Sequence, residues 1–247
     1  MTTLVVPGAE LYLERAGDGP PLLSISGSGS ALSDGMGPAA LPLSRAFDVV
    51  GWDHRGLGRS TSEDGPLTMA DFASDALAVA DSLGWQGFSV FGVSFGGMVA
   101  QELAVTAPQR VRRLVLACTS PGGAGGSSYP LHERPAPEAM AGIVDTRPEV
   151  AASLLSLFAG RPDPKEPGYS RQLEARRTHD VWDRLPLVTA PTLVQAGRFD
   201  GIAPPANSAA IASRIPGAEL REYDGGHAFL FQDQAAWADA VAFLQGS

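Results

Sequence analysis

The chain has 247 residues, of which 44% are hydrophobic and 18% are charged, so it carries enough apolar material for a sizeable core. This composition excludes a disordered or fibrous protein. Its 27 acidic and 18 basic side chains give a net charge of −9, which argues against nucleic acid as a partner.

Short apolar runs alternate with amphipathic stretches along most of the chain, a pattern typical of βαβ units around a parallel sheet. The predicted strands are residues 11–15, 22–26, 47–53, 88–93, 111–118, 192–196 and 219–223. The predicted helices are residues 68–83, 95–106 and 229–245. The predicted fold class is therefore α/β, with a mostly parallel central sheet flanked by helices.

The alternation of apolar runs and amphipathic stretches stops between Thr119 and about Val188, where the sequence contains no strand-like run. The segment begins with a glycine-rich stretch, and helices are then predicted at residues 150–158 and 170–182. We therefore predict two parts. Residues 1–118 and 189–247 form the core, and residues 119–188 form a helical cap, or lid, that is inserted into it.

A Gly-x-Ser-x-Gly pattern at residues 92–96 lies where a predicted strand runs directly into a predicted helix. The pattern alone is weak evidence in a chain with 29 glycines, but the strand-turn-helix setting makes it specific. A sharp turn needs small residues beside the serine. The helix N-terminus also favours an anion that forms next to it. These features predict Ser94 as a nucleophile.

A serine nucleophile needs a base and an acid that orients the base. Asp200 follows the strand predicted at residues 192–196, and His227 follows the strand predicted at residues 219–223. The chain order Ser, Asp, His is the one expected for a nucleophile on a strand-to-helix turn. We therefore predict Ser94, His227 and Asp200 as a catalytic triad. Asp224, Asp180 and Asp183 are alternative acids, but the position of Asp200 after a predicted strand favours Asp200.

With these motifs the chain resembles the α/β-hydrolase superfamily over nearly its whole length. The motifs are the serine turn at residues 92–96, the stretch Asp53-His54-Arg55-Gly56-Leu57-Gly58-Arg59-Ser60, the segment 191–200, and Gly226-His227. The resemblance implies the α/β-hydrolase fold with a helical cap. Within the superfamily the chain is most similar to the branch of enol-lactonases, small-molecule esterases, cofactor-free haloperoxidase-like enzymes and carbon-carbon bond hydrolases.

The same resemblance implies an oxyanion hole made of two backbone N–H groups, those of Phe95 and Ser28. Here the chain departs from the family pattern, because Ser26-Gly27 stands where His-Gly is usual. Backbone donors do not depend on the side chain, so the hole is still expected.

Gly27, Trp182 and Phe229 are the residues that we expect to contact the substrate. The inserted segment also concentrates basic side chains, and an arginine that reached the pocket would favour a substrate with a carboxylate. The basic residues considered are His132, Arg134, Arg161, Arg171, Arg176, Arg177 and His179.

We expect no cofactor and no metal. The motif Gly27-x-Gly29 imitates a dinucleotide fingerprint but lacks its third glycine, because position 32 is Leu32. No histidine or cysteine pair has metal-ligand spacing, and Cys118, the one cysteine, is predicted as a buried strand residue. No signal peptide or run of 18 apolar residues is found, so we expect no membrane partner and a cytoplasmic location.

The sequence thus predicts a cofactor-independent serine hydrolase that cleaves a small-molecule ester or lactone through an acyl-enzyme. Two alternatives stay open: a carbon-carbon bond hydrolase of the same fold, and a protein that senses a ligand without turning it over. The oligomeric state and the natural substrate cannot be inferred from these residues.

Overall fold

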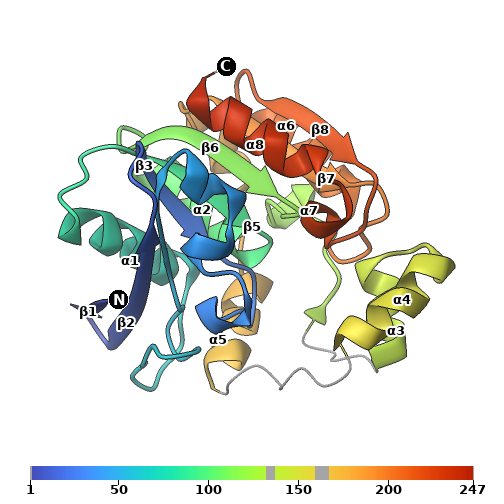
Figure 1. The fold of residues 1–247 in the computed structure, drawn as a ribbon, viewed down its shortest axis with the longest axis horizontal. Coiled ribbons are helices and arrows are strands. Elements are labelled where there is room, and N and C mark those ends of the chain that lie inside the picture. Colours follow the sequence, from blue (N-terminus) through green and yellow to red (C-terminus); the bar gives the residue numbers. More distant parts are fainter. Residues whose placement is uncertain (1, 132–136, 159–166, 247) are drawn as a thin grey trace.

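The computed structural model describes residues 2–131, 137–158 and 167–246, which build an eight-stranded sheet with helices on both faces (Figure 1). In spatial order the strands are β1 (Thr2–Val6), β2 (Ala9–Ala16), β4 (Asp48–Trp52), β3 (Pro21–Ile25), β5 (Phe88–Val93), β6 (Val111–Ala117), β7 (Thr192–Gly197) and β8 (Glu219–Tyr223). The six strands from β4 to β8 pair in parallel, whereas β1 and β2 are antiparallel. The predicted fold class is confirmed.

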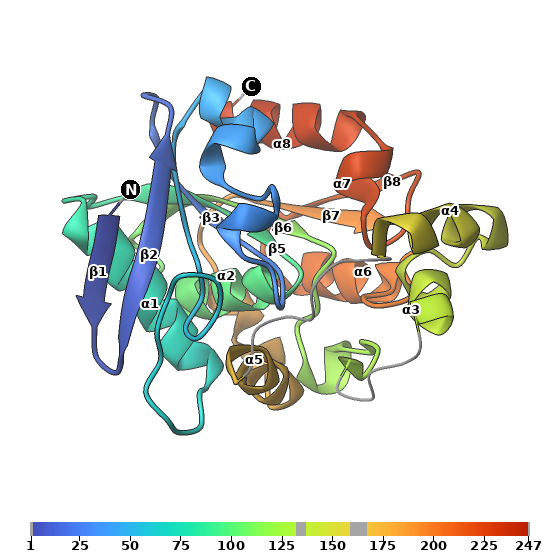
Figure 2. The ribbon, with the colours of Figure 1, turned by 60° about the horizontal axis from the view of Figure 1, so that its bottom comes forward.

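Two hydrophobic clusters fill the two faces of the sheet. On one face lie α1 (Met69–Ser82), α2 (Phe95–Thr106) and α6 (Pro205–Arg214), and on the other lies α8 (Ala235–Gln245), as Figure 2 shows. Successive residues of a strand point to opposite faces. Accordingly Leu114 and Leu116 of β6 pack with the first group, and Val115 packs with α8. Both faces of the central strands are therefore buried, which explains their continuous apolar runs.

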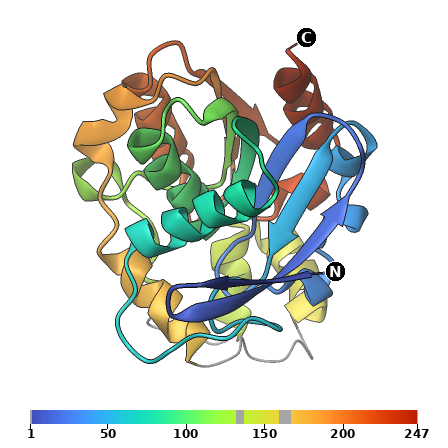
Figure 3. The same ribbon diagram turned by 90° about the vertical axis from the view of Figure 1, so that its left-hand side faces the viewer.

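The hairpin of β1 and β2 at one edge of the sheet was only half predicted, because β1 was missed (Figure 3). Four of the five residues of β1 are exposed or half-buried, so its sequence carries no buried face to signal a strand. The helix predicted at residues 229–245 is interrupted at Asp233 and Gln234, which separate α7 (Phe229–Gln232) from α8. Helix α6 was also missed.

The described part of the inserted segment between β6 and β7 contains the α-helices α3 (Pro137–Val144), α4 (Pro148–Phe158) and α5 (Gly168–Arg177). The last is shorter than predicted, because after Arg177 the chain turns and Asp180 forms a β-bridge with Gly122. A short 3-10 helix, η6 (Trp182–Leu187), then leads toward β7. That this segment acts as a cap stays a prediction. In the described part of the chain, no helix has the length and apolar character needed to cross a membrane.

Candidate active site

Ser94 occupies the turn between β5 and α2 with backbone angles φ 54° and ψ −115°, a conformation rare for a residue with a side chain. The flanking glycines make this turn possible. A Cβ on Gly92 would lie 2.6 Å from the Gly96 carbonyl oxygen, and one on Gly96 would collide with the Ile25 carbonyl. The Ser94 N–H donates to the Ala117 carbonyl at 2.8 Å, which ties the turn to β6.

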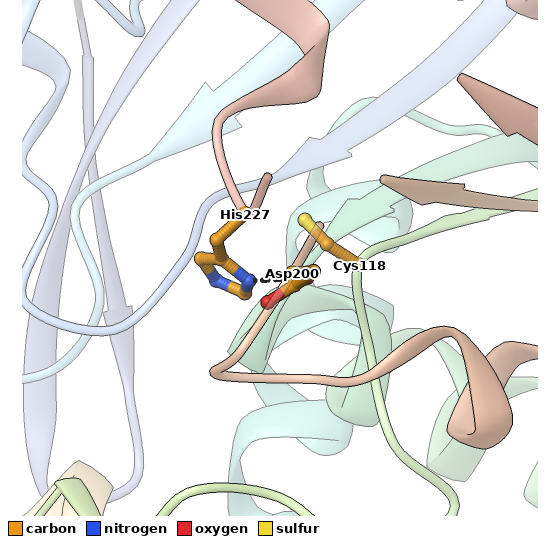
Figure 4. Close-up of side chains that lie close together, drawn as sticks. All are labelled: Cys118, Asp200 and His227. Carbon is orange, nitrogen blue, oxygen red and sulfur yellow. Dashed lines mark hydrogen bonds and ion pairs between the residues drawn. The ribbon is translucent and has the colours of Figure 1, made fainter. Parts of the chain in front are cut away.

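The structure brings Ser94, His227 and Asp200 together, each at the carboxyl end of a parallel strand. His227 Nε2 lies 3.0 Å from Ser94 Oγ. On the other side of the ring, Nδ1 lies 2.8 Å from Asp200 Oδ2, and Figure 4 shows how the imidazole and this carboxylate face each other. Because a carboxylate only accepts hydrogen bonds, Nδ1 carries the proton and Nε2 is left to accept the serine O–H. The geometry therefore suits proton transfer from Ser94 to His227.

Asp200 is fixed more firmly than the histidine that it faces. Its side chain is 1% exposed, against 17% for His227. The second carboxylate oxygen, Oδ1, accepts the N–H groups of Ile202 and Ala203, both at 2.8 Å. Both oxygens of the acid are thus held, so Oδ2 stays directed at the imidazole.

The loops that carry the acid and the base both bind the end of α3, in the inserted segment. His227 N–H donates to the Val144 carbonyl at 2.6 Å, and Gly201 N–H donates to the Ile143 carbonyl at 2.9 Å. Sequence reasoning missed this role, because it depends on carbonyl groups and on a tertiary contact that no local pattern reveals.

A buried carboxylate next to α3 reinforces this contact. Asp145 is fully buried and accepts hydrogen bonds from Arg147 and from Gln232 Nε2, the latter at 3.0 Å. Burial by itself would raise the pKa of Asp145, but these donors outweigh it and lower that pKa. Gln232 Oε1 in turn accepts the N–H of Gly226, directly before the histidine, at 2.8 Å.

The loop predicted to supply one oxyanion donor lies against the nucleophile. A Cβ on Gly27 would be 3.5 Å from Ser94 Cβ, so Gly27 lies next to Ser94, and its contact with substrate stays a prediction. Phe95 provides the first N–H of α2, a group that has no partner inside the helix. The roles of Phe95 and Ser28 as oxyanion donors stay predictions.

Three contacts from other elements hold this loop in place. His54 Nε2 faces the Ser26 carbonyl at 3.2 Å, and Asp53 Oδ1 accepts the Leu32 N–H at 2.7 Å. From α5, Gln172 Oε1 accepts the N–H of Gly29 at 2.8 Å. The Asp53-His54 pair belongs to the family motif, whereas the contribution of Gln172 carried no signal in the sequence.

Cys118 lies beside Asp200 and close to His227, directly after β6 (Figure 4). One ligand-type atom from each of Cys118, Asp200 and His227 lies within 4.8 Å of the others. Burial, reinforced by the Asp200 charge, raises the pKa of the thiol well above its ordinary value. The sulfur is therefore a buried thiol that packs beside the acid rather than a thiolate.

Two predicted substrate contacts do not lie where we expected them. Phe229 is fully buried and stacks on Tyr223 with the ring centres 5.2 Å apart, so the prediction of a substrate contact is wrong. Trp182 packs on Gly125, and the Arg214 guanidinium lies 4.8 Å from its ring centre. The structure thus gives Trp182 a packing role between the insert and α6.

The three alternative acids are engaged elsewhere. Asp224 pairs with Arg147 at 2.8 Å, and Asp183 lies 3.4 Å from Arg214. Asp180 is exposed and lies close to Gly123. The His227 imidazole faces Asp200 instead.

Comparison with known proteins places the chain among hydrolases. A sequence model described as alpha/beta hydrolase fold matches residues 27–127. A putative carbamate hydrolase, RutD, from Azorhizobium caulinodans is 30% identical over 243 residues, which covers 90% of this chain and 89% of that protein. The 2-hydroxymuconate semialdehyde hydrolase of Pseudomonas putida is 37% identical over 130 residues, 52% of this chain and 44% of that protein. Among solved structures, the enol-lactonase from Burkholderia xenovorans LB400 superposes with a TM-score of 0.82 at 26% identity, covering 100% of both chains.

Proposed function

The chain is an enzyme of the α/β-hydrolase family, and we propose that it is a cofactor-independent serine hydrolase acting on a small-molecule ester or lactone. The observation that carries the proposal is the unbroken series of hydrogen bonds from Ser94 Oγ through His227 to Asp200. Each of these side chains stands at the carboxyl end of a strand, where this architecture places its reacting groups.

In the proposed reaction, His227 Nε2 takes the hydroxyl proton as Ser94 Oγ attacks the substrate carbonyl. Asp200 stabilises the imidazolium that forms, and the N–H groups of Phe95 and Ser28 stabilise the oxyanion. The imidazolium then protonates the departing alkoxide, which leaves an acyl group on Ser94. Water, deprotonated by His227, attacks this acyl-enzyme and releases the acid, and the proton on His227 returns to Ser94.

We further propose that residues 119–188 act as a cap that completes the site. The support comes from their contacts with three loops that carry site residues. Helix α3 binds the loops of Asp200 and His227 through the Ile143 and Val144 carbonyls, and Gln172 of α5 binds the loop of Ser28. A cap linked in this way covers the nucleophile and limits the substrate to small molecules.

Similarity to an enol-lactonase over the whole chain supports a lactone or ester substrate. The name of the RutD relative adds carbamates to the acyl compounds that should be assayed. A carbon-carbon bond hydrolase is the second candidate, favoured by the 37% identity to 2-hydroxymuconate semialdehyde hydrolase over half of the chain. Hydrolysis of a 2-hydroxy-6-oxo-dienoic acid, with no turnover of esters or lactones, would select this second candidate.

The experiment is to treat the protein with a fluorophosphonate and measure its intact mass. The proposal expects one adduct on the wild type, none on Ser94→Ala, and an unchanged adduct on Ser89→Ala, which removes another serine of β5. An adduct that persists in Ser94→Ala would contradict the assignment of the nucleophile. A folded wild type that forms no adduct and cleaves no ester would overturn the proposal and favour ligand sensing, which thermal-shift screening would then test.

A further inference from the structure

A cavity of about 230 Å³ lies between α2, the loop that follows β6, and α5. In the described part of the chain, none of the reacting side chains and neither proposed oxyanion donor borders it. A ligand in this cavity would therefore occupy a second site, separate from the proposed catalytic site. The side chains on which the argument rests are Ser120, Ser128, Arg176 and His179.

Arg176 differs from the other arginines of α5 in its partners. Arg171 and Arg177 each form an ion pair of 2.7 Å with a carboxylate. Arg176 is half-buried in the cavity wall, and within the described ranges no carboxylate lies at ion-pair distance from it. Burial lowers the pKa of its guanidinium, and the Tyr169 phenol opposes this effect. A partly desolvated cation without a counter-charge is unfavourable, so this position favours an anion from solution.

His179 is a second, independent polar group without a partner in the cavity wall. It is 5% exposed, and neither ring nitrogen has a hydrogen-bond partner among the residues that the structure describes. Burial lowers its pKa to about 4, although the Glu102 charge and the Ser120 backbone oppose this. The ring is therefore neutral near pH 7 and carries one N–H donor. A buried donor without an acceptor is costly, and an oxygen atom of a ligand would satisfy it.

The acidic groups near His179 do not cancel the charge of Arg176. Glu102 accepts two hydrogen bonds of 2.7 Å from Arg184 and is neutralised by it. Asp180 is exposed, beside Gly123. Both carboxylates border a different cavity, and no acidic side chain is found in the wall of this one as far as the structure describes it.

Two serine hydroxyls in the segment after β6 add donors. Ser120 Oγ accepts the Gly122 N–H at 3.2 Å, and Ser128 Oγ accepts an N–H of the Asn207 amide at 3.1 Å. Because each oxygen already accepts, its own O–H is left to donate. Donors thus reach the cavity both from the segment after β6 and from the end of α5.

We propose that this cavity is a binding site for a phosphate group. Arg176 supplies the charge and two parallel N–H donors, and His179 and the serine hydroxyls supply single donors. A phosphate presents its oxygens in several directions and accepts more hydrogen bonds than a carboxylate, so it suits donors that come from separate segments. The inference goes beyond the proposed function and does not depend on it.

The size of the cavity narrows the class of ligand. Since one water molecule takes up about 30 Å³, a volume of 230 Å³ corresponds to about seven or eight waters, which is more than a phosphate group fills. Met98, Pro130 and Leu173 add apolar surface to the wall. The ligand is therefore free phosphate accompanied by water, or a phosphate monoester of a small organic alcohol.

The test is calorimetric titration with inorganic phosphate and with phenyl phosphate, at neutral pH and at constant ionic strength. Acetate and benzoate serve as the corresponding carboxylates. The proteins are the wild type, Arg176→Met, His179→Phe and Arg177→Met. The last is the matched control, because Arg177 also borders the cavity but already pairs with Glu174.

We expect one phosphate or phenyl phosphate to bind per wild-type chain. Arg176→Met should weaken this binding about 10- to 100-fold, His179→Phe about 5- to 10-fold, and Arg177→Met less than about threefold. Tighter binding of phenyl phosphate would identify a monoester as the ligand, and tighter binding of inorganic phosphate would identify free phosphate. The proposal is overturned if the wild type binds neither, if the carboxylates bind as tightly, or if Arg177→Met loses as much affinity as Arg176→Met.

Thermal unfolding without phosphate separates a binding role of Arg176 from a structural one. Arg176→Met removes a charge without a partner, so it should unfold at the wild-type temperature or above it. Arg184→Met leaves Glu102 buried without its partner and should unfold at a lower temperature. Phosphate should then stabilise the wild type and not Arg176→Met. Equal destabilisation of the two variants would give Arg176 a structural role and overturn the site.

The variant Ser94→Ala separates this proposal from the proposed hydrolase function. It should bind phosphate as the wild type does, because Ser94 does not border the cavity. Loss of binding in Ser94→Ala, together with competitive inhibition of ester hydrolysis by phosphate, would put the anion at the catalytic serine and overturn the second site. Binding to a wild type that forms no fluorophosphonate adduct would instead remove the hydrolase function and keep the phosphate site.

Discussion

The backbone N–H of His227 donates to the carbonyl of Val144 at 2.6 Å, so the last residue of α3 positions the loop that carries the proposed base. This contact is close because Gly226 has no side chain. A Cβ on Gly226 would collide with the Val144 carbonyl oxygen and lie 2.7 Å from Asp145 Cα.

Gly226→Ala should therefore push the His227 loop away from α3. We expect kcat for ester hydrolysis to fall at least about tenfold, because small errors in the position of a catalytic group are costly. Gly142→Ala is the matched control. It lies within α3 with no atom near the added methyl group, and it should leave kcat unchanged while stabilising the helix slightly. Equal activity of the two variants would show that the contact with Val144 does not position the base.

Gln172→Met should loosen the loop that contains Ser28, because the Gly29 N–H loses its acceptor. We expect kcat to fall about 10- to 100-fold with little change in KM, since an oxyanion donor acts mainly in the transition state. Steady-state kinetics on a neutral ester measures this split. Gln86→Met, the same substitution at an exposed position, should behave as the wild type. A change in KM alone would assign Gln172 to substrate binding instead.

The buried ion pair of Arg55 and Asp75 predicts a large effect on stability. Arg55 belongs to the motif at residues 53–60, and its guanidinium makes two hydrogen bonds of 2.6 Å to Asp75 of α1. Removing one charge leaves the other buried and unpaired, so Asp75→Asn should lower the free energy of unfolding by about 3 kcal/mol. Asp81→Asn breaks a more exposed pair with Arg110 and should cost less than about 1 kcal/mol. Urea denaturation distinguishes the two variants.

His54 makes stability depend on pH. It is buried among Trp52, Phe72 and Phe95, and burial lowers its pKa to about 4. The unfolded chain takes up its proton near pH 6.5, whereas the folded chain does so only near pH 4, so stability is lost as pH falls through this interval. The loss from this group should reach about 2 kcal/mol at pH 5. The variant His54→Gln should show a smaller drop between pH 7.5 and pH 5 in urea titrations, and an identical drop would refute this account.

The Cys118 thiol should resist alkylation in the native protein. It is fully buried, and its pKa is raised, so almost no thiolate is available near neutral pH. Iodoacetamide at pH 8 should add no mass to the folded protein, and one carbamidomethyl group should appear once urea unfolds it. Rapid labelling without denaturant would show that the region behind Asp200 opens to solvent.

The positions of Ser94, Asp200 and His227 in the fold could be predicted from the sequence, because each lies within four residues of the end of a predicted strand. Parallel strands all end at one edge of the sheet, so residues 133 positions apart in the chain, Ser94 and His227, could be expected to meet. Glycines around Ser94 added a second local signal. These inferences needed no knowledge of the loops.

The missed features depend on tertiary contacts. Gln172 and Val144 act through hydrogen bonds to the backbone of distant loops, and no periodicity marks them. Phe229 was placed in the site by its closeness to His227 in sequence, but a short helix turns its ring onto Tyr223. Arg176 could not be distinguished from its neighbours, because only the folded structure reveals which arginines already have partners.

The carbonyl groups at the end of α3 also determine which inserted segments could be transplanted from one relative into another. The Ile143 and Val144 carbonyls bind two different loops of the core. A transplanted insert would therefore have to place two consecutive carbonyls at the same positions and in the same directions. The Ile143 and Val144 side chains would in addition have to fit the small hydrophobic cluster into which they pack. We therefore expect active chimeras when the transplanted helix ends at the same residue relative to the core. Sequence identity of the insert should matter less.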